Sequence, residues 1–411
     1  MKVDMRQPAS NRLLIYAPVP LYRVGEQLFL EDQARVGLRL WAENFATVAA
    51  MMPVIDAPPP EGWSPYAAGN IDRVVLHPLP CAYTPLRFAR CLGPTRARIA
   101  ALIDEADILS FAIGGLFGDW GAVASFVAHG KDRPFAVWTD RVESAVTRLT
   151  AASGSFKTRL RKRLTAGPMW QLEKAVIRRA SVGLFHGRDT FDTYAPFCRN
   201  PKVVHDILLD RSLQITEEDF AAKQRASGQG PLQIVYAGRA DDMKGPLEWL
   251  EALAQLKAGG VDFRARWLGD GPMLADMRRA AEQAGIGDVV TMPGFVADRE
   301  AVIAALRQAH LFVFCHKTPE SPRCLIEALM SGTPIVGYDS AYARELVEGF
   351  GGGRFVANGS VAALADVISD LSHARGALLD LQRAARRDGQ RFDQDSVFRD
   401  RSEILKQALA A

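Results

Sequence analysis

The chain has 411 residues, of which 48% are hydrophobic and 24% charged, so two or three globular domains are expected and disordered, collagen-like and coiled-coil classes are excluded. Lys and Arg number 50 against 47 Asp and Glu, and the resulting charge of +3 does not indicate a nucleic-acid-binding protein. With no apolar run of 18 residues, no recognisable secretory leader and no Cys-x-x-Cys spacing, we expect a cytoplasmic chain with reduced thiols.

The first half of the chain alternates apolar runs with amphipathic segments. Residues 13–18 predict a first strand, a loop with Gly25 follows, and residues 31–44 predict a helix. Further strands are predicted at 47–54, 74–76, 108–113, 135–138 and 182–186. This alternation predicts a doubly wound, Rossmann-like domain over residues 1–210.

One segment of this half, residues 155–180, is both basic and apolar. Its basic residues fall within seven positions and no acidic residue appears before Glu173; they are Lys157, Arg159, Arg161, Lys162 and Arg163. Apolar side chains follow at Met169, Trp170, Leu172, Val176 and Ile177. The combination predicts peripheral docking on the inner face of an anionic membrane, or on a lipid-linked acceptor. A helix whose apolar side packs in the core fits the same residues, and the sequence leaves both readings open.

The second half of the chain shows the strand–helix alternation more clearly. The sequence between Asp206 and Pro231 is polar and ends in ASGQGP, which predicts an interdomain linker at residues 211–230. Residues 231–385 then place strands at 232–237, 263–268, 289–292, 311–315, 334–337 and 354–356, with helices between them. Residues 386–411 predict a helical segment that returns to the N-terminal domain. The fold class is therefore α/β, with two Rossmann-like domains facing across a cleft, and ligands are expected beyond the carboxyl ends of the strands.

Two cations lie in the loop after the strand at 232–237. Gly238 precedes Arg239, and Gly245 follows Lys244. A guanidinium that can bind two oxygens and a mobile ammonium on a glycine-flanked loop suit a diphosphate. A solvated loop explains the same residues equally well when they are taken alone.

Two carboxylates flank the start of the helix predicted after 311–315. Glu320 lies before the helix N-terminus and Glu327 in its second turn, with Ser321, Arg323 and Cys324 between them. A helix N-terminus attracts anions, and a carboxylate can accept hydrogen bonds from vicinal hydroxyls such as those of a ribose. Partners of the helix dipole would explain both acids without any ligand.

Glycine turns complete an ordered set of motifs at successive strand ends. They are Gly269-Asp270-Gly271 and Gly294-Phe295. Together, GRADDMKGPLEWLEAL, WLGDGPML, VVTMPGFV and ESPRCLIEALMSGTPIVGYDS resemble the donor domain of family-4-type retaining glycosyltransferases, which have the GT-B architecture. The resemblance covers roughly residues 233–355.

The resemblance implies a role for each matched residue. Arg239 and Lys244 would bind the donor diphosphate, Glu320 would lie near the transferred sugar, Glu327 would bind the ribose, and the glycine turns would contact the base. Two departures stand out. Six residues separate Glu320 from Glu327 where the family has seven, and VVHDILLDRS stands where many relatives have P-N-G-V-D.

The acceptor side of the first domain is less well defined. Many relatives place a His after the fourth strand, but here that loop reads SFAIGGLFGDWG. Asp119 and Asp140 are the nearest polar candidates for catalysis, although a cap or a loop ion pair explains them too. Candidates for acceptor contact are Gly25, Gly114 and Gly115.

The resemblance implies a glycosyltransferase that uses a nucleotide diphosphate sugar and retains the anomeric configuration. Because Arg239 and Lys244 supply positive charge, we expect it to need neither metal nor cofactor. The expected acceptor is a glycan, a lipid-linked glycan or a small molecule. Two alternatives remain: a non-catalytic nucleotide-sugar or glycolipid-binding protein, and a nucleotide-sugar epimerase or phosphorylase on the same architecture. The D-x-D form at Asp393–Asp395 follows no apolar strand and is expected to be a surface feature.

Overall fold

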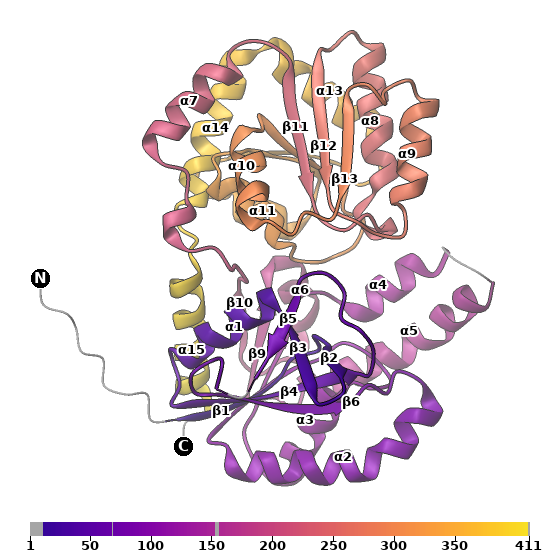
Figure 1. Cartoon of the computed structure of the whole chain (residues 1–411), viewed down its shortest axis with the longest axis vertical. Helices are drawn as coiled ribbons and strands as arrows, with labels where there is room; N and C mark the ends of the chain where they lie inside the picture. Colours follow the sequence, from indigo (N-terminus) through magenta and orange to yellow (C-terminus); the bar gives the residue numbers. More distant parts are fainter. Residues whose placement is uncertain (1–10, 68, 153–155, 410–411) are drawn as a thin grey trace, which may run out of the picture. The chain divides into compact units, whose positions relative to one another are not determined.

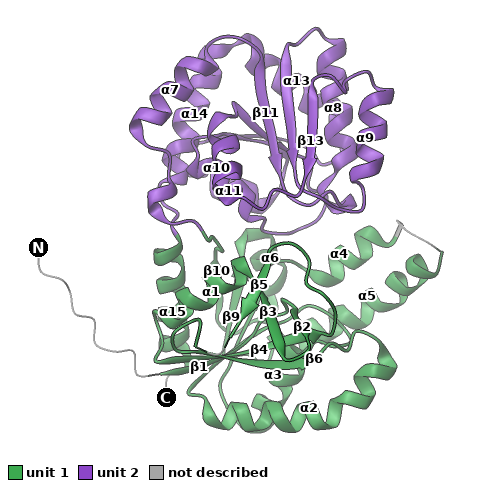
Figure 2. Cartoon of the chain, viewed as in Figure 1, with its two compact units in different colours: residues 1–208, 394–411 green, residues 209–393 purple. Residues whose placement is uncertain are grey.

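The computed structural model describes residues 11–67, 69–152 and 156–409, which form two compact units (Figures 1 and 2). Unit 1 comprises residues 1–208 and 394–411, and unit 2 comprises residues 209–393. No helix in the described ranges is both long enough and apolar enough to cross a membrane.

Unit 1 is built on one twisted sheet. Its strand order is β10-β9-β8-β7-β1-β4-β2-β3-β5, with β6 also paired to β4. The strands from β10 to β4, and β6, run parallel, whereas β3 pairs antiparallel with β2 and β5. The strands are β1 Arg12–Tyr16, β2 Leu21–Val24, β3 Gln27–Glu31, β4 Thr47–Ile55, β5 Trp63–Tyr66, β6 Val74–Pro80, β7 Ile108–Ala112, β8 Ala136–Thr139, β9 Val182–His186 and β10 Pro201–Val204. The predicted loop with Gly25 is the short turn of a hairpin, and the two strands that flank it, β2 and β3, were not predicted.

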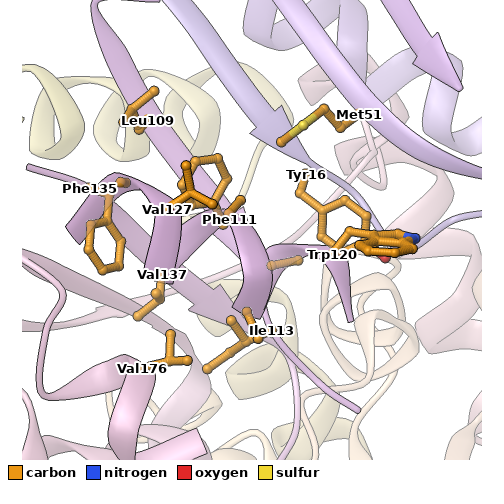
Figure 3. Close-up of a cluster of buried hydrophobic side chains, with 14 of the residues drawn as sticks. Tyr16, Met51, Leu109, Phe111, Ile113, Trp120, Val127, Phe135, Val137 and Val176 are labelled. Carbon is orange, nitrogen blue, oxygen red and sulfur yellow. The ribbon is translucent and has the colours of Figure 1, made fainter. Parts of the chain in front are cut away.

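Helices cover both faces of the unit 1 sheet. Successive residues of β1 alternate between two cores: Leu14 and Tyr16 join one, and Leu13 and Ile15 the other. Figure 3 shows part of the first core, including Trp120 of α3 and Val176 of α5. The helices of unit 1 are α1 Asp32–Ala42, α2 Pro85–Glu105, α3 Trp120–Gly130, α4 Glu143–Leu149, α5 Phe156–Ile177, α6 Gly187–Tyr194 and α15 Gln394–Leu409.

The last helix of the chain packs in unit 1. Phe398, Leu405 and Leu409 of α15 belong to its second core. Arg401 is 3% exposed, lies 3.3 Å from Asp206 and stacks over Trp41, which lets a charged side chain occupy an apolar interior. The D-x-D form contributes Asp395 to the first turn of this helix.

Unit 2 has a parallel sheet in the order β13-β12-β11-β14-β15-β16. The order runs outward from β11 in one direction, then restarts at β14 in the other, so the two strands mark a topological switch point. The strands are β11 Leu232–Ala237, β12 Phe263–Leu268, β13 Val290–Gly294, β14 Leu311–Phe314, β15 Ile335–Tyr338 and β16 Gly353–Val356. Both β11 and β14 are buried almost throughout, as apolar strands covered on two faces should be.

Helices α8, α9 and α13 lie on one side of this sheet, and α7, α10, α11 and α14 on the other (Figure 1). The helices of unit 2 are α7 Glu217–Ser227, α8 Pro246–Ala258, α9 Leu274–Gln283, α10 Arg299–Gln308, α11 Arg323–Met330, α12 Ala341–Leu346, α13 Val361–His373 and α14 Arg375–Gly389. The boundary predicted at residue 386 is wrong, because it falls inside α14, which belongs to unit 2. The C-terminal part of unit 1 begins at residue 394.

The predicted linker 211–230 is wrong, because it is an integral part of unit 2. Helix α7 buries Phe220, Lys223 and Ser227 against the unit. The Lys223 ammonium donates to Ser331 O at 3.2 Å and to the hydroxyl of Thr333. A narrow buried stripe is enough to hold a helix whose other residues are polar, which is why its composition resembled a linker.

Candidate functional site

The site lies at the switch point of unit 2, where backbone hydrogen bonds join three loops. The loop after β11 is joined to the last residue of β12 by Gly238 N–H to Leu268 O at 2.9 Å, and to the loop after β12 by Ala240 N–H to Asp270 O at 2.9 Å. The loop after β14 is joined to that after β11 by Lys317 N–H to Met243 O at 2.9 Å. The side chains that follow these strands are therefore held on a fixed backbone frame.

Two glycines allow this close approach. A Cβ on Gly269 would lie 2.0 Å from Gly238 O, and one on Gly245 would lie 2.3 Å from Cys315 O. Gly245 also has φ +64°, in the left-handed region that favours glycine. It ends the short helix Asp242–Lys244 and opens α8, so it fixes where Lys244 can reach.

The centre of the site is an ion pair between Lys244 and Glu320. Lys244 Nζ donates to Glu320 Oε1 at 2.6 Å, and the two side chains are only 14% and 9% exposed. Lys244 comes from the loop after β11 and Glu320 from the loop after β14, so residues 76 positions apart meet at the switch point. The sequence had assigned these two groups to the diphosphate and to the sugar, and the structure brings them into contact.

Three other predicted residues around the pair are exposed. Arg239 is exposed and makes no ion pair with a residue in the described ranges. The Asp270 carboxylate accepts from Gly271 N–H at 2.7 Å, which stabilises the turn after β12. Phe295 is 51% exposed directly after β13. An exposed guanidinium and an exposed ring are available for an anion and for stacking on a planar group, respectively.

Glu327 lies on the buried side of α11 and pairs with a residue that the sequence analysis missed. Its carboxylate is 6% exposed and accepts a hydrogen bond from the guanidinium of Arg299. Arg299 begins α10, four residues after Phe295. Its place just beyond a strand end could have identified it, but its distance from Glu327 could not be read from the sequence.

The remaining predicted residues surround the start of α11. Arg323 is the first residue of this helix, and Ser321 and Cys324 are its close neighbours. Burial raises the pKa of the Cys324 thiol to about 12, so the thiol is protonated at neutral pH. It therefore contributes a small weakly polar surface and no nucleophile.

His316, also missed, lies against the central ion pair. Its Nε2 is 2.9 Å from the Tyr236 hydroxyl, and its Nδ1 is 3.9 Å from Glu320 Oε1. Burial, and then the charge of Lys244, lower its pKa well below 6.5, so the ring is neutral. It is the first polar residue after an apolar strand, the position where ligand-binding residues are expected in such sheets.

The candidates of unit 1 do not converge on a comparable group of side chains. Asp119 is buried as the N-cap of α3, where it accepts from Ala122 N–H at 2.9 Å and from Gly114 N–H at 3.1 Å. Asp140 is exposed after β8. Gly114 and Gly115 lie just beyond β7, whereas Gly25 has φ +58° in the hairpin turn, where its open surroundings show a turn requirement only.

Residues 217–388 match the protein family described as Glycosyl transferases group 1. WcaL of Salmonella typhimurium, whose name refers to glycosyl transfer in colanic acid biosynthesis, is 33% identical over 184 residues, or 43% of this chain and 45% of WcaL. The amylovoran biosynthesis glycosyltransferase AmsK of Erwinia amylovora is 28% identical over 199 residues, or 47% of this chain and 49% of AmsK. The alignments thus span about half of each relative.

The fold comparison extends over nearly the whole chain. The crystal structure of HepE from Anabaena in complex with UDP superposes with a TM-score of 0.65 at 17% identity, covering 96% of this chain and all of HepE. At that identity the likeness concerns the fold alone. The expected architecture of two Rossmann-like domains, named GT-B, is confirmed.

Proposed function

Because residues 217–388 match the family described as Glycosyl transferases group 1, we propose that this chain transfers a sugar from a nucleotide diphosphate sugar to an acceptor. The carrying observation is the Lys244–Glu320 pair at the switch point, with Arg239 exposed in the same loop. A diphosphate would attract Lys244 away from Glu320 and engage Arg239. The two cations then stabilise negative charge on the leaving nucleoside diphosphate, which is the main expected source of rate enhancement.

Glu327 and Arg299 form the proposed nucleotide end of the donor site. The Glu327 carboxylate can accept from both hydroxyls of a ribose while Arg299 holds its orientation. Phe295 offers a face for the base. UDP is a reasonable first ligand, because HepE was crystallised with it.

A thermal-shift screen of UDP, GDP and ADP tests the donor site, since a ligand that binds the native state raises its stability. Release of nucleoside diphosphate from a panel of UDP-, GDP- and ADP-sugars then tests turnover. Stabilisation by one nucleotide with no turnover of any sugar donor would favour the binding protein over the enzyme. Conversion of a donor into its epimer without nucleotide release would favour the epimerase.

We propose retention of configuration and independence from metal as properties of the same site. Lys244 and Arg239 supply the positive charge that a cation would supply elsewhere. The test is donor turnover in excess chelator, with the anomer of the product read by proton NMR. Loss of activity that magnesium or manganese restores would contradict independence from metal, and an inverted product would contradict retention.

The acceptor is proposed to be a growing glycan, which is consistent with relatives named for colanic acid and amylovoran biosynthesis. Contact with an anionic membrane is proposed too, but not through the apolar residues expected at first. Met169 is 6% exposed, Val176 and Ile177 are fully buried, and Trp170 and Leu172 pack against the core of unit 1. Those side chains hold α5 in the unit and are not available to lipid.

A different stripe of α5 is available. Phe156, Leu160 and Leu164 are 78%, 47% and 67% exposed and recur every four residues, so they share one side of the helix. Exposed basic side chains flank the stripe on both sides: Lys157, Arg159, Arg161 and Arg163. Lys162 points inward and donates to Thr150 O at 2.9 Å. Apolar residues with cations beside them suit the surface of an anionic leaflet.

A pocket of about 470 Å³ between α4 and α5 lies beside this stripe, with Arg148, Arg163 and Trp170 in its lining. Two guanidiniums there suit a phosphate headgroup. Co-sedimentation with vesicles of phosphatidylglycerol and of phosphatidylcholine, at low and high salt, tests the docking. We expect binding to the anionic vesicles at low salt, and its loss in a variant with Phe156, Leu160 and Leu164 changed to Ser. Equal binding of that variant, or none by the wild type, would refute it.

A further inference from the structure

The imidazole of His316 occupies a position that the donor chemistry described so far does not use. It follows β14, and its ring lies between the Tyr236 hydroxyl, from β11, and the Glu320 carboxylate. The His316 side chain is 7% exposed, and its ring packs against Phe314 at a centroid distance of 5.2 Å. Such an enclosed ring has little freedom to turn, so the directions of its two nitrogens are fixed.

The surroundings of the ring decide which nitrogen carries the proton. A neutral imidazole has one N–H and one lone pair. A lone pair on Nδ1 would face Glu320 Oε1 at 3.9 Å and be repelled, whereas an N–H there is attracted. The proton therefore belongs on Nδ1, and Nε2 accepts a hydrogen bond from the Tyr236 hydroxyl at 2.9 Å.

The Tyr236 hydroxyl is itself held in place. Its ring stacks on Trp267 at 4.0 Å and is buried in the sheet. A Cβ on Gly238 would lie 2.8 Å from the hydroxyl oxygen, so the glycine at the end of β11 leaves room for it. The buried Tyr236 hydroxyl, near the end of β11, thus fixes the tautomer of His316 by donating to its Nε2.

We propose that His316 is a positioning residue: its Nδ1–H holds the Glu320 carboxylate in place when Lys244 leaves that carboxylate to engage the donor diphosphate. This inference rests on the proposed function, since it needs a ligand that competes for Lys244. In the structure Lys244 Nζ is 2.6 Å from Glu320 Oε1, and His316 Nδ1 is 3.9 Å from the same oxygen. With the diphosphate bound, a modest rotation of the carboxylate would bring it within hydrogen-bond distance of Nδ1.

Two substitutions at one position separate the functions of the two nitrogens. His316→Asn places an amide N–H near Nδ1 and abandons Tyr236, whereas His316→Gln reaches Tyr236 and leaves Glu320 without the donor. His310 provides the matched control: it is also a buried His, at the opposite end of β14, and its Nδ1 accepts from Gln233 N–H at 3.2 Å. His310→Asn should affect stability without changing turnover by the folded enzyme.

The experiment measures UDP affinity, and the kcat and KM for whichever sugar donor of the panel the wild type consumes. We expect His316→Gln to lower kcat by about 10- to 100-fold, the cost of a misplaced catalytic group, with UDP affinity within about twofold of the wild type. His316→Asn should retain most of kcat, and Tyr236→Phe should lose several-fold. Nitrogen-15 NMR of the imidazole should show protonation on Nδ1, with partial loss of that preference in Tyr236→Phe.

The possible failures are distinct. A wild type that consumes no donor of the panel would refute the proposed function, and the role of His316 with it. An active wild type with an unaffected His316→Gln variant would refute only the inference. So would a proton on Nε2, or a His316→Asn variant no better than His316→Gln.

Discussion

Both units have a topological switch point between parallel strands, but the residues that follow the strands there differ. In unit 2 the strands β11 and β14 are followed by Lys244 and Glu320, whose charged atoms meet in a nearly buried pair. In unit 1 the strands at the equivalent place are β1 and β7. Ala17 and Pro18 follow β1, and Gly114 and Gly115 lie just beyond β7, so neither strand is followed directly by a charged side chain. The buried carboxylate of Asp119 caps α3.

Under the proposed function, this difference corresponds to two kinds of ligand. A fixed pair of charges in unit 2 suits the constant, ionic part of a substrate, since opposite charges can be exchanged for those of a diphosphate. Unit 1 offers backbone groups and exposed side chains, which suit a neutral partner or one that varies. The following experiments would break or sharpen this contrast.

The largest effect is expected at Lys244. Lys244→Ala removes the ammonium that would stabilise the leaving diphosphate, and it strips Glu320 of a charged partner. We expect kcat/KM for the sugar donor to fall on the order of 100-fold or more. Lys257→Ala, an exposed lysine on α8 paired with Asp288 at 3.5 Å, is the matched control and should be near wild type. Near-normal turnover by Lys244→Ala would show that the Lys244–Glu320 pair is not part of the donor site.

Asp119 should show that the unit 1 carboxylate serves structure. Burial raises its folded-state pKa from 3.8 to about 6, against an ordinary value in the unfolded chain. Between about pH 4 and pH 6 the folded state therefore binds more protons than the unfolded state, so stability falls as pH rises. Two pKa units correspond to roughly 3 kcal/mol. Urea unfolding of wild type and Asp119→Asn from pH 4 to 7 should show this slope only in the wild type; parallel curves would contradict it.

The two glutamates of unit 2 should separate binding from turnover. Glu327→Ala should weaken UDP binding about tenfold, because it removes the acceptor for the ribose hydroxyls and leaves Arg299 without its ion pair. Glu320→Ala should lower kcat with a smaller effect on UDP affinity. Calorimetry with UDP and steady-state kinetics separate the two. The reverse pattern would show that the spacing of six residues between these acids has changed which one reaches the sugar.

Charged residues after apolar strands were the predictable part of the site, since a parallel sheet gathers its strand ends at one edge. Lys244, Glu320 and Glu327 were found in this way. The contacts of Arg299 and His316 were not, because each depends on a distance across two loops that sequence spacing does not contain.

The strands of unit 2 could be predicted from the regular alternation of strand and helix patterns. The elements that were predicted wrongly lack a clear pattern of apolar residues. The β2–β3 hairpin, LYRVGEQLFLE, lacks the apolar alternation of a half-buried strand. Helix α7 buries a narrow stripe, so its polar composition was taken for a linker. In α5 the apolar residues near the start of the helix, such as Leu160 and Leu164, are exposed, whereas those near its end, such as Val176, are buried. A count of apolar residues over the whole helix does not separate the two sets.

The smallest effect is expected at Leu164, on the exposed stripe of α5. Leu164 is 67% exposed, whereas Met169 is 6% exposed on the same helix. Leu164→Gln should change the free energy of unfolding by less than about 0.5 kcal/mol, because most of the side chain is already in water. Met169→Gln should cost on the order of 2 kcal/mol, because it buries an amide among apolar side chains. Urea unfolding measures both, and vesicle co-sedimentation of Leu164→Gln shows whether the stripe touches lipid. If Leu164→Gln were as destabilising as Met169→Gln, the stripe would be packed against protein, and the membrane surface of unit 1 would have to lie elsewhere.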